Sequence, residues 1–249
     1  MNYDGLQTAY WQSQIARVGA LRDKIAATDP TQPGRVVPDE EDLAIGQGRR
    51  LRMAVLFLDI SGFSSRPSET EDEQRLLLKV LNLFFTEMIK IAEEYGGTVE
   101  KNTGDGLMAY FEDGAGDPAE TGSKRAVSCA LTMMAANQHL IKPILDATPV
   151  PDIRFRISID YGTVIIARLG AARRFNANVA IGATANFACK MLSFAQPGEI
   201  VIGASVRDGL PPGWYQFIQS MPVTTGWSYC VSGLPYALFK YTGRWSGLT

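Results

Sequence analysis

The segment VLFLDISGFSS, residues 55–65, decides how the rest of the sequence is interpreted. Its apolar residues predict a buried strand, and that strand ends on Asp59. A carboxylate at the end of a core strand costs several kcal/mol if it stays ionised without a partner. We therefore expect Asp59 to have a partner.

The composition excludes several classes of function. The 249 residues include 24 basic and 26 acidic side chains, so the charge balance gives no reason to expect a nucleic acid or an anionic membrane as partner. The sequence contains three cysteines that lie far apart (Cys129, Cys189 and Cys230) and one histidine, His139. These residues cannot build a thiolate or His-rich metal centre, so any bound metal must have oxygen ligands. The sequence has no export signal and no apolar run of about 18 residues, which predicts a cytoplasmic protein without membrane insertion.

Helical and strand periodicities alternate along the chain. Residues 6–27 predict a helix, and a segment rich in proline and acidic residues follows, so we divide the chain into a helix and linker (1–47) and a globular domain (48–249). The order of elements predicts an α+β fold with a ferredoxin-like βαββαβ core and additional C-terminal strands. The expected elements are a strand at 51–60, a helix at 71–95, a hairpin around NTGDG (102–106), a helix from 119 to 145, a strand at 153–162 with 163–170 as its hairpin partner, a helix at 183–195, and strands at 198–203 and 236–243.

Two aspartates become neighbours in this order of elements. The first strand and the hairpin can lie side by side at the sheet centre, which brings Asp59 close to Asp105. A hard divalent cation such as Mg²⁺ resolves the repulsion between two carboxylates. The small residues Ser61, Gly62, Phe63 and Ser64 offer backbone N–H groups as a cradle for phosphates. Alternatively, Asp59 caps a turn and Asp105 only favours the hairpin, but their joint placement favours the metal site.

These residues resemble the class III nucleotidyl cyclases, whose catalytic domains begin with a strand that ends in a DIxGF signature. Here LDISGF (58–63) is followed by VEKNTGDGLMAYF (99–111) and VAIGATANFACKML (179–192), which resemble the next two motifs of the family. The motifs occur in the family's order at suitable separations. The resemblance covers roughly residues 50–241.

The resemblance implies a head-to-tail homodimer with two active sites at its interface and a nucleoside triphosphate as substrate. The ribose 3′-hydroxyl would attack the α-phosphorus, and pyrophosphate would leave, as in other two-metal sites. By position, the resemblance implies that Asp59, Asp105 and the carbonyl of Ile60 bind two Mg²⁺ or Mn²⁺ ions, that Asn186 orients the ribose, that Lys190 replaces the transition-state arginine, and that Lys101 contacts the base.

Val179 departs from the pattern of adenylate-forming relatives, which carry Asp or Thr at this position. Valine cannot accept a hydrogen bond from the adenine amine, and an unmet polar group costs about 1–3 kcal/mol. Lys101 beside an apolar wall suits uracil, which presents carbonyl oxygens. The neighbouring Asn178 weakens this interpretation, although strand alternation places it on the opposite face.

These features resemble the Pycsar pyrimidine cyclases of bacterial anti-phage defence. That resemblance implies a uridylate cyclase whose product, cyclic UMP, is read by a separate effector. CTP and ATP remain alternative substrates.

Lys190 is the second departure, because lysine lacks the planar fork with which arginine grips phosphate. Arg168, Arg173 or Arg174 offers a substitute. A catalytically degenerate nucleotide-sensing dimer is the alternative hypothesis, and the retention of both aspartates favours the enzyme.

Overall fold

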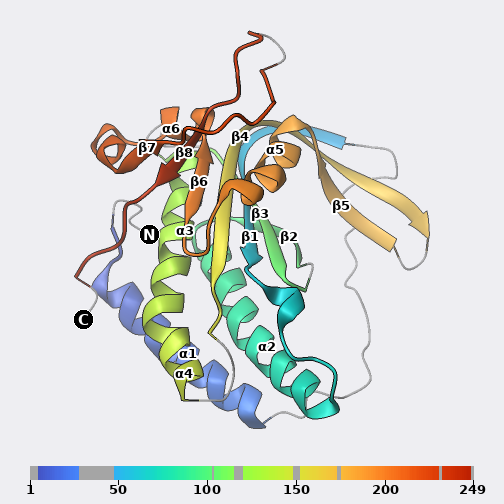
Figure 1. Cartoon of the computed structure of the whole chain (residues 1–249), viewed down its shortest axis with the longest axis vertical. Coiled ribbons are helices and arrows are strands. Elements are labelled where there is room, and N and C mark those ends of the chain that lie inside the picture. The colour runs from blue at the N-terminus through green and yellow to red at the C-terminus, as the bar shows by residue number, and fades with distance from the viewer. Residues whose placement is uncertain are drawn as a thin grey trace.

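A computed structural model describes residues 5–27, 48–102, 104–114, 120–147, 152–172, 175–229 and 232–247. Its centre is one sheet with the strand order β2-β3-β1-β4-β6-β8-β7, in which β5 pairs with β4 (Figure 1). Neighbouring strands are antiparallel except β4 and β6, which are parallel. The strands are β1 (Gly48–Ile60), β2 (Thr98–Asn102), β3 (Gly106–Glu112), β4 (Phe155–Ala172), β5 (Phe175–Ile181), β6 (Ile200–Gly203), β7 (Ile218–Ser220) and β8 (Leu238–Tyr241). The predicted α+β class is therefore confirmed.

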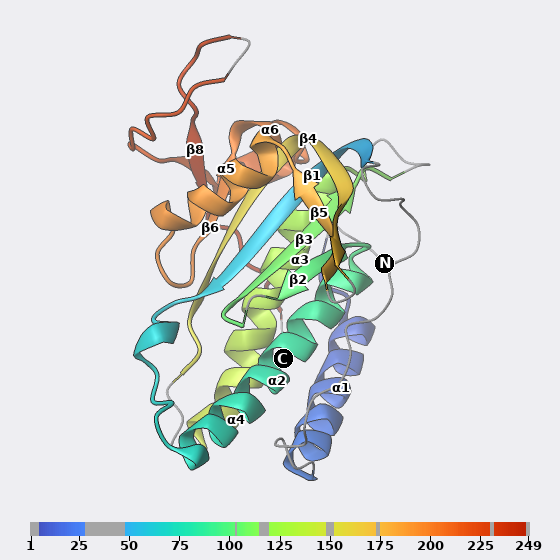
Figure 2. The same cartoon turned by 90° about the vertical axis from the view of Figure 1, so that its right-hand side faces the viewer.

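Helices cover both faces of the sheet. Side chains of β1 alternate between the two faces of the sheet. Leu56 and Leu58 are buried on the face covered by α2 (Glu71–Glu94) and α3 (Gly122–Ala136), whereas Met53 and Val55 pack on the opposite face. The helix on that opposite face is α5 (Ala183–Met191), and Figure 2 shows it across the sheet from α2 and α3. The short α6 (Ala204–Asp208) follows β6.

The helix α2 has identifiable start and stop signals. Thr70 accepts from the backbone N–H of Glu73, whose side chain accepts from the N–H of Thr70, forming a capping box. Gly96, with a φ of 72°, ends the helix in the left-handed conformation that glycine adopts without strain. The next predicted helix is observed as α3, a π-helical turn η2 (Asn137–Ile141) and α4 (Lys142–Asp146).

The predicted hairpin between residues 153–162 and 163–170 is wrong. Both segments belong to the single long strand β4, whose hairpin partner is β5. Gly162, at the junction of the two segments, allows a close approach of α5, because a Cβ there would lie 2.5 Å from Thr184 Oγ1. The short strand β7 was not predicted.

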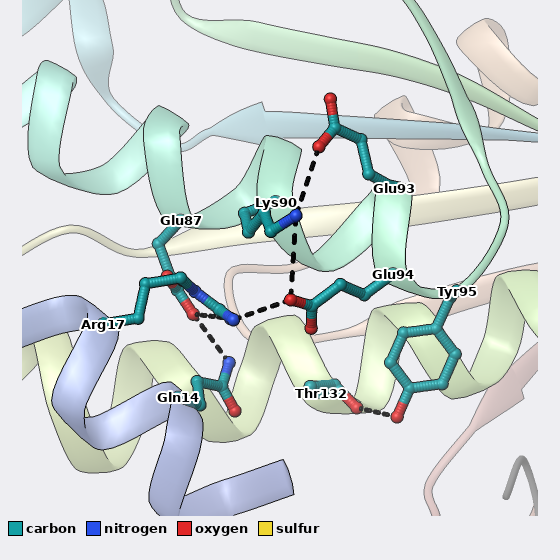
Figure 3. A network of polar contacts seen from close by, with 8 residues as sticks. All are labelled: Gln14, Arg17, Glu87, Lys90, Glu93, Glu94, Tyr95 and Thr132. Atoms are coloured by element: carbon teal, nitrogen blue, oxygen red, sulfur yellow. Dashed lines mark hydrogen bonds and ion pairs between the residues drawn. The ribbon is translucent and has the colours of Figure 1, made fainter. Parts of the chain in front are cut away.

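The N-terminal helix α1 (Thr8–Ala27) lies against α2. Trp11 and Val18 are buried there. In Figure 3, the fully buried Glu87 of α2 accepts hydrogen bonds from Gln14 Nε2 at 2.8 Å and from Arg17 Nε at 3.0 Å. The helix is thus part of the folded body. The linker expected after it lies outside the described residues, and the proposed domain boundary remains a prediction.

Candidate active site

Asp59 and Asp105 lie at the same end of neighbouring strands. Asp59 is opposite Gly106 in the antiparallel pairing of β1 with β3. The N–H of Ile60 donates to the carbonyl oxygen of Asp105 at 2.8 Å, which fixes the turn against the end of β1. The predicted adjacency of the first strand and the hairpin is therefore confirmed.

Arg156 pairs with Asp59, a contact that the sequence analysis did not predict. It lies opposite Asp59 on β4, and its Nε donates to Asp59 Oδ2 at 2.9 Å. About a quarter of the Asp59 side chain is exposed, so the pair is half-buried at the sheet edge. Arg156 Nη1 also donates to the carbonyl oxygen of Ala195 at 3.4 Å. The sequence alternation over 153–162 places Arg156 on a strand face, but only the register identifies Asp59 as its partner.

The loop after β1 is held by backbone contacts. Ser61 N–H donates to the carbonyl oxygen of Arg154 at 2.8 Å, so this predicted phosphate-binding group is already used within the chain. Gly62 has a φ of 68° and precedes one 3-10 turn, Phe63–Ser65. The backbone N–H groups of Gly62, Phe63 and Ser64 therefore remain as the predicted phosphate-binding groups of this loop.

A cleft of about 720 Å³ opens between the ends of β1 and β3 and the helix α5. Asp59 and Asn186 both line it, together with Met108 of β3. The Ser158 hydroxyl anchors α5 on β4 by donating to the carbonyl oxygen of Ala188 at 2.6 Å. A cleft of this size accommodates a small molecule such as a nucleotide.

Lys190 lies one helical turn beyond Asn186 on α5 and is exposed. Its Nζ is 5.9 Å from the centroid of the Trp227 ring, within reach of a cation–π interaction. Trp227 in turn stacks on Phe187 of α5 at 5.3 Å. The C-terminal segment thus contacts the helix that carries Asn186 and Lys190.

Lys101 and Val179 lie on β2 and β5, where the structure describes their backbone only. Their sequence neighbours are bonded to each other, because Glu100 Oε2 accepts from the Ala180 N–H at 2.8 Å. Glu100 sits at a β-bulge in β2, which disrupts the strand pairing locally. The side chains of Asn178, Arg168, Arg173 and Arg174 lie outside the described part of the chain.

Residues 47–224 match the family model of the adenylate and guanylate cyclase catalytic domain. The chain belongs to this family. An adenylate cyclase of Anabaena cylindrica is 30% identical over 158 residues, which are 61% of this chain but only 29% of that protein. A uridylate cyclase of Rhodovulum sp. is 27% identical over 173 residues, 67% of this chain and 68% of that protein.

Solved structures support the same class III cyclase fold. The adenylyl cyclase CyaB from P. aeruginosa matches with a TM-score of 0.63 and 24% identity, covering 80% of this chain and 98% of that one. Within the described part of this cyclase, no helix is both long and apolar enough to cross a membrane.

The donor atoms in this cyclase suit the divalent ions that class III cyclases generally use. Asp59 and Asp105 stand at one end of the sheet and would offer carboxylate oxygens, and Ile60 would offer its backbone carbonyl. No group of three or more His, Cys, Asp or Glu side chains that could hold a metal ion gathers among the described residues. Mg²⁺ is commonly held by one or two carboxylates together with substrate phosphates, so the residues present fit it.

Proposed function

We propose that this cyclase converts a nucleoside triphosphate, with UTP favoured, into the 3′,5′-cyclic monophosphate and pyrophosphate. The preference for UTP over ATP is inferred from Val179. This apolar residue stands where adenylate-forming relatives place a hydrogen-bond acceptor. The bond between Glu100 and Ala180 supports a common role for Lys101 and Val179, because it ties their two strands together.

The chain supplies binding and orientation for this reaction. Asp59, Asp105 and the Ile60 carbonyl would hold Mg²⁺ or Mn²⁺, which would lower the pKa of the ribose 3′-hydroxyl and stabilise charge on the transferring phosphoryl group. Asn186 of one subunit would position the ribose over Asp59 and Asp105 of the other, as the homodimer of the family implies, and Asn186 and Asp59 of each chain line the cleft that would face the partner. Lys190 would place positive charge near the α-phosphate.

One of the relatives, a uridylate cyclase, supports the proposal of a pyrimidine substrate. The Rhodovulum uridylate cyclase matches this chain over similar fractions of both proteins, whereas the match to the Anabaena adenylate cyclase covers a minor part of that protein. We propose that the product acts in anti-phage defence through a separate effector, by analogy with the Pycsar cyclases.

The first experiment incubates the purified protein with Mn²⁺ and ATP, GTP, CTP or UTP separately and identifies products by mass spectrometry. We expect cyclic UMP. Cyclic AMP as the main product would keep the reaction but contradict the role assigned to Val179. No product from any nucleotide, in a folded dimer, would favour a nucleotide-sensing protein.

Replacement of Val179 with Asp tests the choice of base directly. The new carboxylate restores an acceptor for the adenine amine, so we expect the ratio of ATP to UTP turnover to rise by about tenfold or more. Asn178→Asp is the matched control, because it adds the same charge at the adjacent position, which strand alternation places on the other face. Equal effects of the two substitutions would contradict the assignment of Val179.

A mixed dimer tests whether the sites are shared between subunits. We expect Asp59→Ala and Asn186→Ala each to be inactive alone and to recover part of the activity when the two chains are mixed, because one of the two sites then has both groups. The control mixes Asp59→Ala with Asp105→Ala, so that every site lacks one of its two aspartate ligands for the metal. Recovery in the control alone, or in neither mixture, would contradict a site built across the interface.

A further inference from the structure

A second cavity, of about 440 Å³, lies at the end of the helical layer. It is formed by the C-terminal part of α3, the π-helical turn η2, residues 152–155 before and at the start of β4, the turn at 197–198, and residues 244–245. Among the described residues, its lining has no member in common with the lining of the active-site cleft. Its volume lies within the range of about 300–1,000 Å³ typical of small-molecule sites. A separate ligand therefore has room to bind.

The lining of this cavity carries an excess of positive charge. Among the described residues, neither Arg154 nor Arg244 forms an ion pair with a carboxylate. Within the described part of the chain, Arg244 donates to the carbonyl oxygens of Gly243 and Gly198, and desolvation lowers its pKa although the charge of Glu199 opposes this shift. The nearby Glu199 is paired with Lys240. Two guanidinium groups that form no ion pair among the described residues are a suitable receptor for a phosphate group.

The same lining offers oxygen acceptors without donors. Asn137 Oδ1 and Asp152 Oδ1 are buried, and within the described part of the chain neither accepts a hydrogen bond. Lys142 contacts the other carboxylate oxygen of Asp152 at 3.7 Å. Buried acceptors in proteins are nearly always satisfied, so hydroxyl groups of a ligand would complete them. The chemistry thus favours a phosphate carried on a body rich in hydroxyl groups.

The wall of this cavity is also the support of the active-site loop. Arg66 Nη2 donates to the Asp152 carbonyl oxygen at 2.7 Å, and Ser61 N–H donates to the Arg154 carbonyl oxygen at 2.8 Å. Two residues further along β4, Arg156 binds Asp59. Side chains of the segment 152–156 therefore line the cavity. The same segment holds the loop from Asp59 to Arg66 through its hydrogen bonds.

We propose that this cavity is a regulatory site for a small phosphate monoester with hydroxyl groups, and that its ligand stabilises the active-site loop. Arg154 and Arg244 bind the phosphate, and Asn137 and Asp152 accept from the hydroxyl groups. Binding fixes the segment 152–156 and so favours the arrangement of the loop that holds metal and substrate. The binding is independent of the proposed function, whereas the effect on the rate rests on it.

Calorimetric titration of the full chain with glucose 6-phosphate as a probe tests the binding. We expect the Arg154→Gln and Arg244→Gln variants to weaken binding by about tenfold or more, since each removes a charge-assisted hydrogen bond. Arg75→Gln is the matched control, because Arg75 is an exposed arginine on α2, away from the cavity, and pairs with Glu71. No binding of the probe, or equal binding by the control and both cavity variants, would overturn the proposal.

Further probes separate the two halves of the proposed ligand. Inorganic phosphate and glucose should each bind at least about tenfold more weakly than glucose 6-phosphate, because each engages only part of the lining. Asn186→Ala should bind the probe like the wild type, since Asn186 lines the other cleft. Inorganic phosphate that binds as tightly as the sugar phosphate would overturn the role of Asn137 and Asp152, and loss of binding in Asn186→Ala would place the probe in the active site.

The coupling is measured as the cyclisation rate at a limiting concentration of free Mn²⁺. We expect the probe to raise that rate about fivefold or more in the wild type and to leave it unchanged in Arg154→Gln, a coupling typical of linked sites. An equal rise in both would overturn the proposed route through the segment 152–156. Binding without any cyclase activity would contradict the proposed function alone, whereas activity without probe binding would contradict this site alone.

Discussion

Asp160 provides a quantitative test of the physical reasoning applied to this fold. It lies on β4 with 2% of its surface exposed, and its Oδ1 has no hydrogen-bond partner among the described residues. Gly203 of β6 packs against it so closely that a Cβ would collide with Oδ1. Burial raises the pKa of Asp160 from 3.8 to about 6, although hydrogen bonds from Tyr236 and from the Tyr161 backbone oppose this shift.

This raised pKa makes the stability of the fold depend on pH. Below the unfolded pKa of 3.8, the carboxyl is protonated in both states and the full stability is present. Between 3.8 and about 6, the folded state binds the proton more tightly, so stability falls as pH rises. A shift of about two units corresponds to a loss of about 3 kcal/mol above the folded pKa.

The Asp160→Asn variant removes this titration and keeps the shape of the side chain. We expect its free energy of unfolding to exceed that of the wild type by up to about 3 kcal/mol at neutral pH and to lose this advantage near pH 4. Urea unfolding across this pH range measures the difference. The control is Asp208→Asn, because Asp208 is exposed and paired with Arg207 on α6.

A constant difference between the Asp160→Asn variant and the wild type over this pH range would contradict the predicted titration of Asp160. So would an equal pH dependence in the Asp208→Asn control. Either result would mean that the buried environment of Asp160 does not disfavour its charge.

Asp59→Ala and Asp105→Ala should each lower the cyclisation rate by at least about a hundredfold, since each removes a proposed metal ligand, and near-normal turnover in either variant would contradict that assignment. Arg17→Ala should destabilise the fold by about 3 kcal/mol in urea unfolding, because it leaves the fully buried Glu87 without its charged partner. Arg22→Ala, which removes only an exposed contact on α1, should change stability by less than about 0.5 kcal/mol, and equal losses in both would contradict a structural role for the buried pair.

The arrangement of the central strands was predictable because burial leaves a clear signal. The apolar run before Asp59 and the order of elements together placed β1 beside the hairpin, as observed. The prediction failed at Gly162, where glycine serves a close contact with Thr184 and the chain continues as a strand. A single sequence does not distinguish a glycine that is needed for a turn from a glycine that is needed for close packing.

The candidate site was predictable where motifs mark it and less so where contacts are long-range. Asp59 and Asp105 stand in recognisable segments, whereas the contact between Asp59 and Arg156 joins residues 97 positions apart. Similarly, Glu100 and Ala180 meet only because β2 and β5 converge on one face. Neither pair has a local pattern that identifies its partner, because strand register is decided by tertiary packing.

The position of β8 inside the sheet has a consequence for the synthesis of this protein. β8 lies between β6 and β7, so the buried strand β6 has one unpaired edge until residues 238–241 have left the ribosome. An open, apolar strand edge readily pairs with other chains. A chain that ends before Leu238 would therefore be a substrate for chaperones, aggregation or proteolysis, and only products extended through Tyr241 can close the sheet.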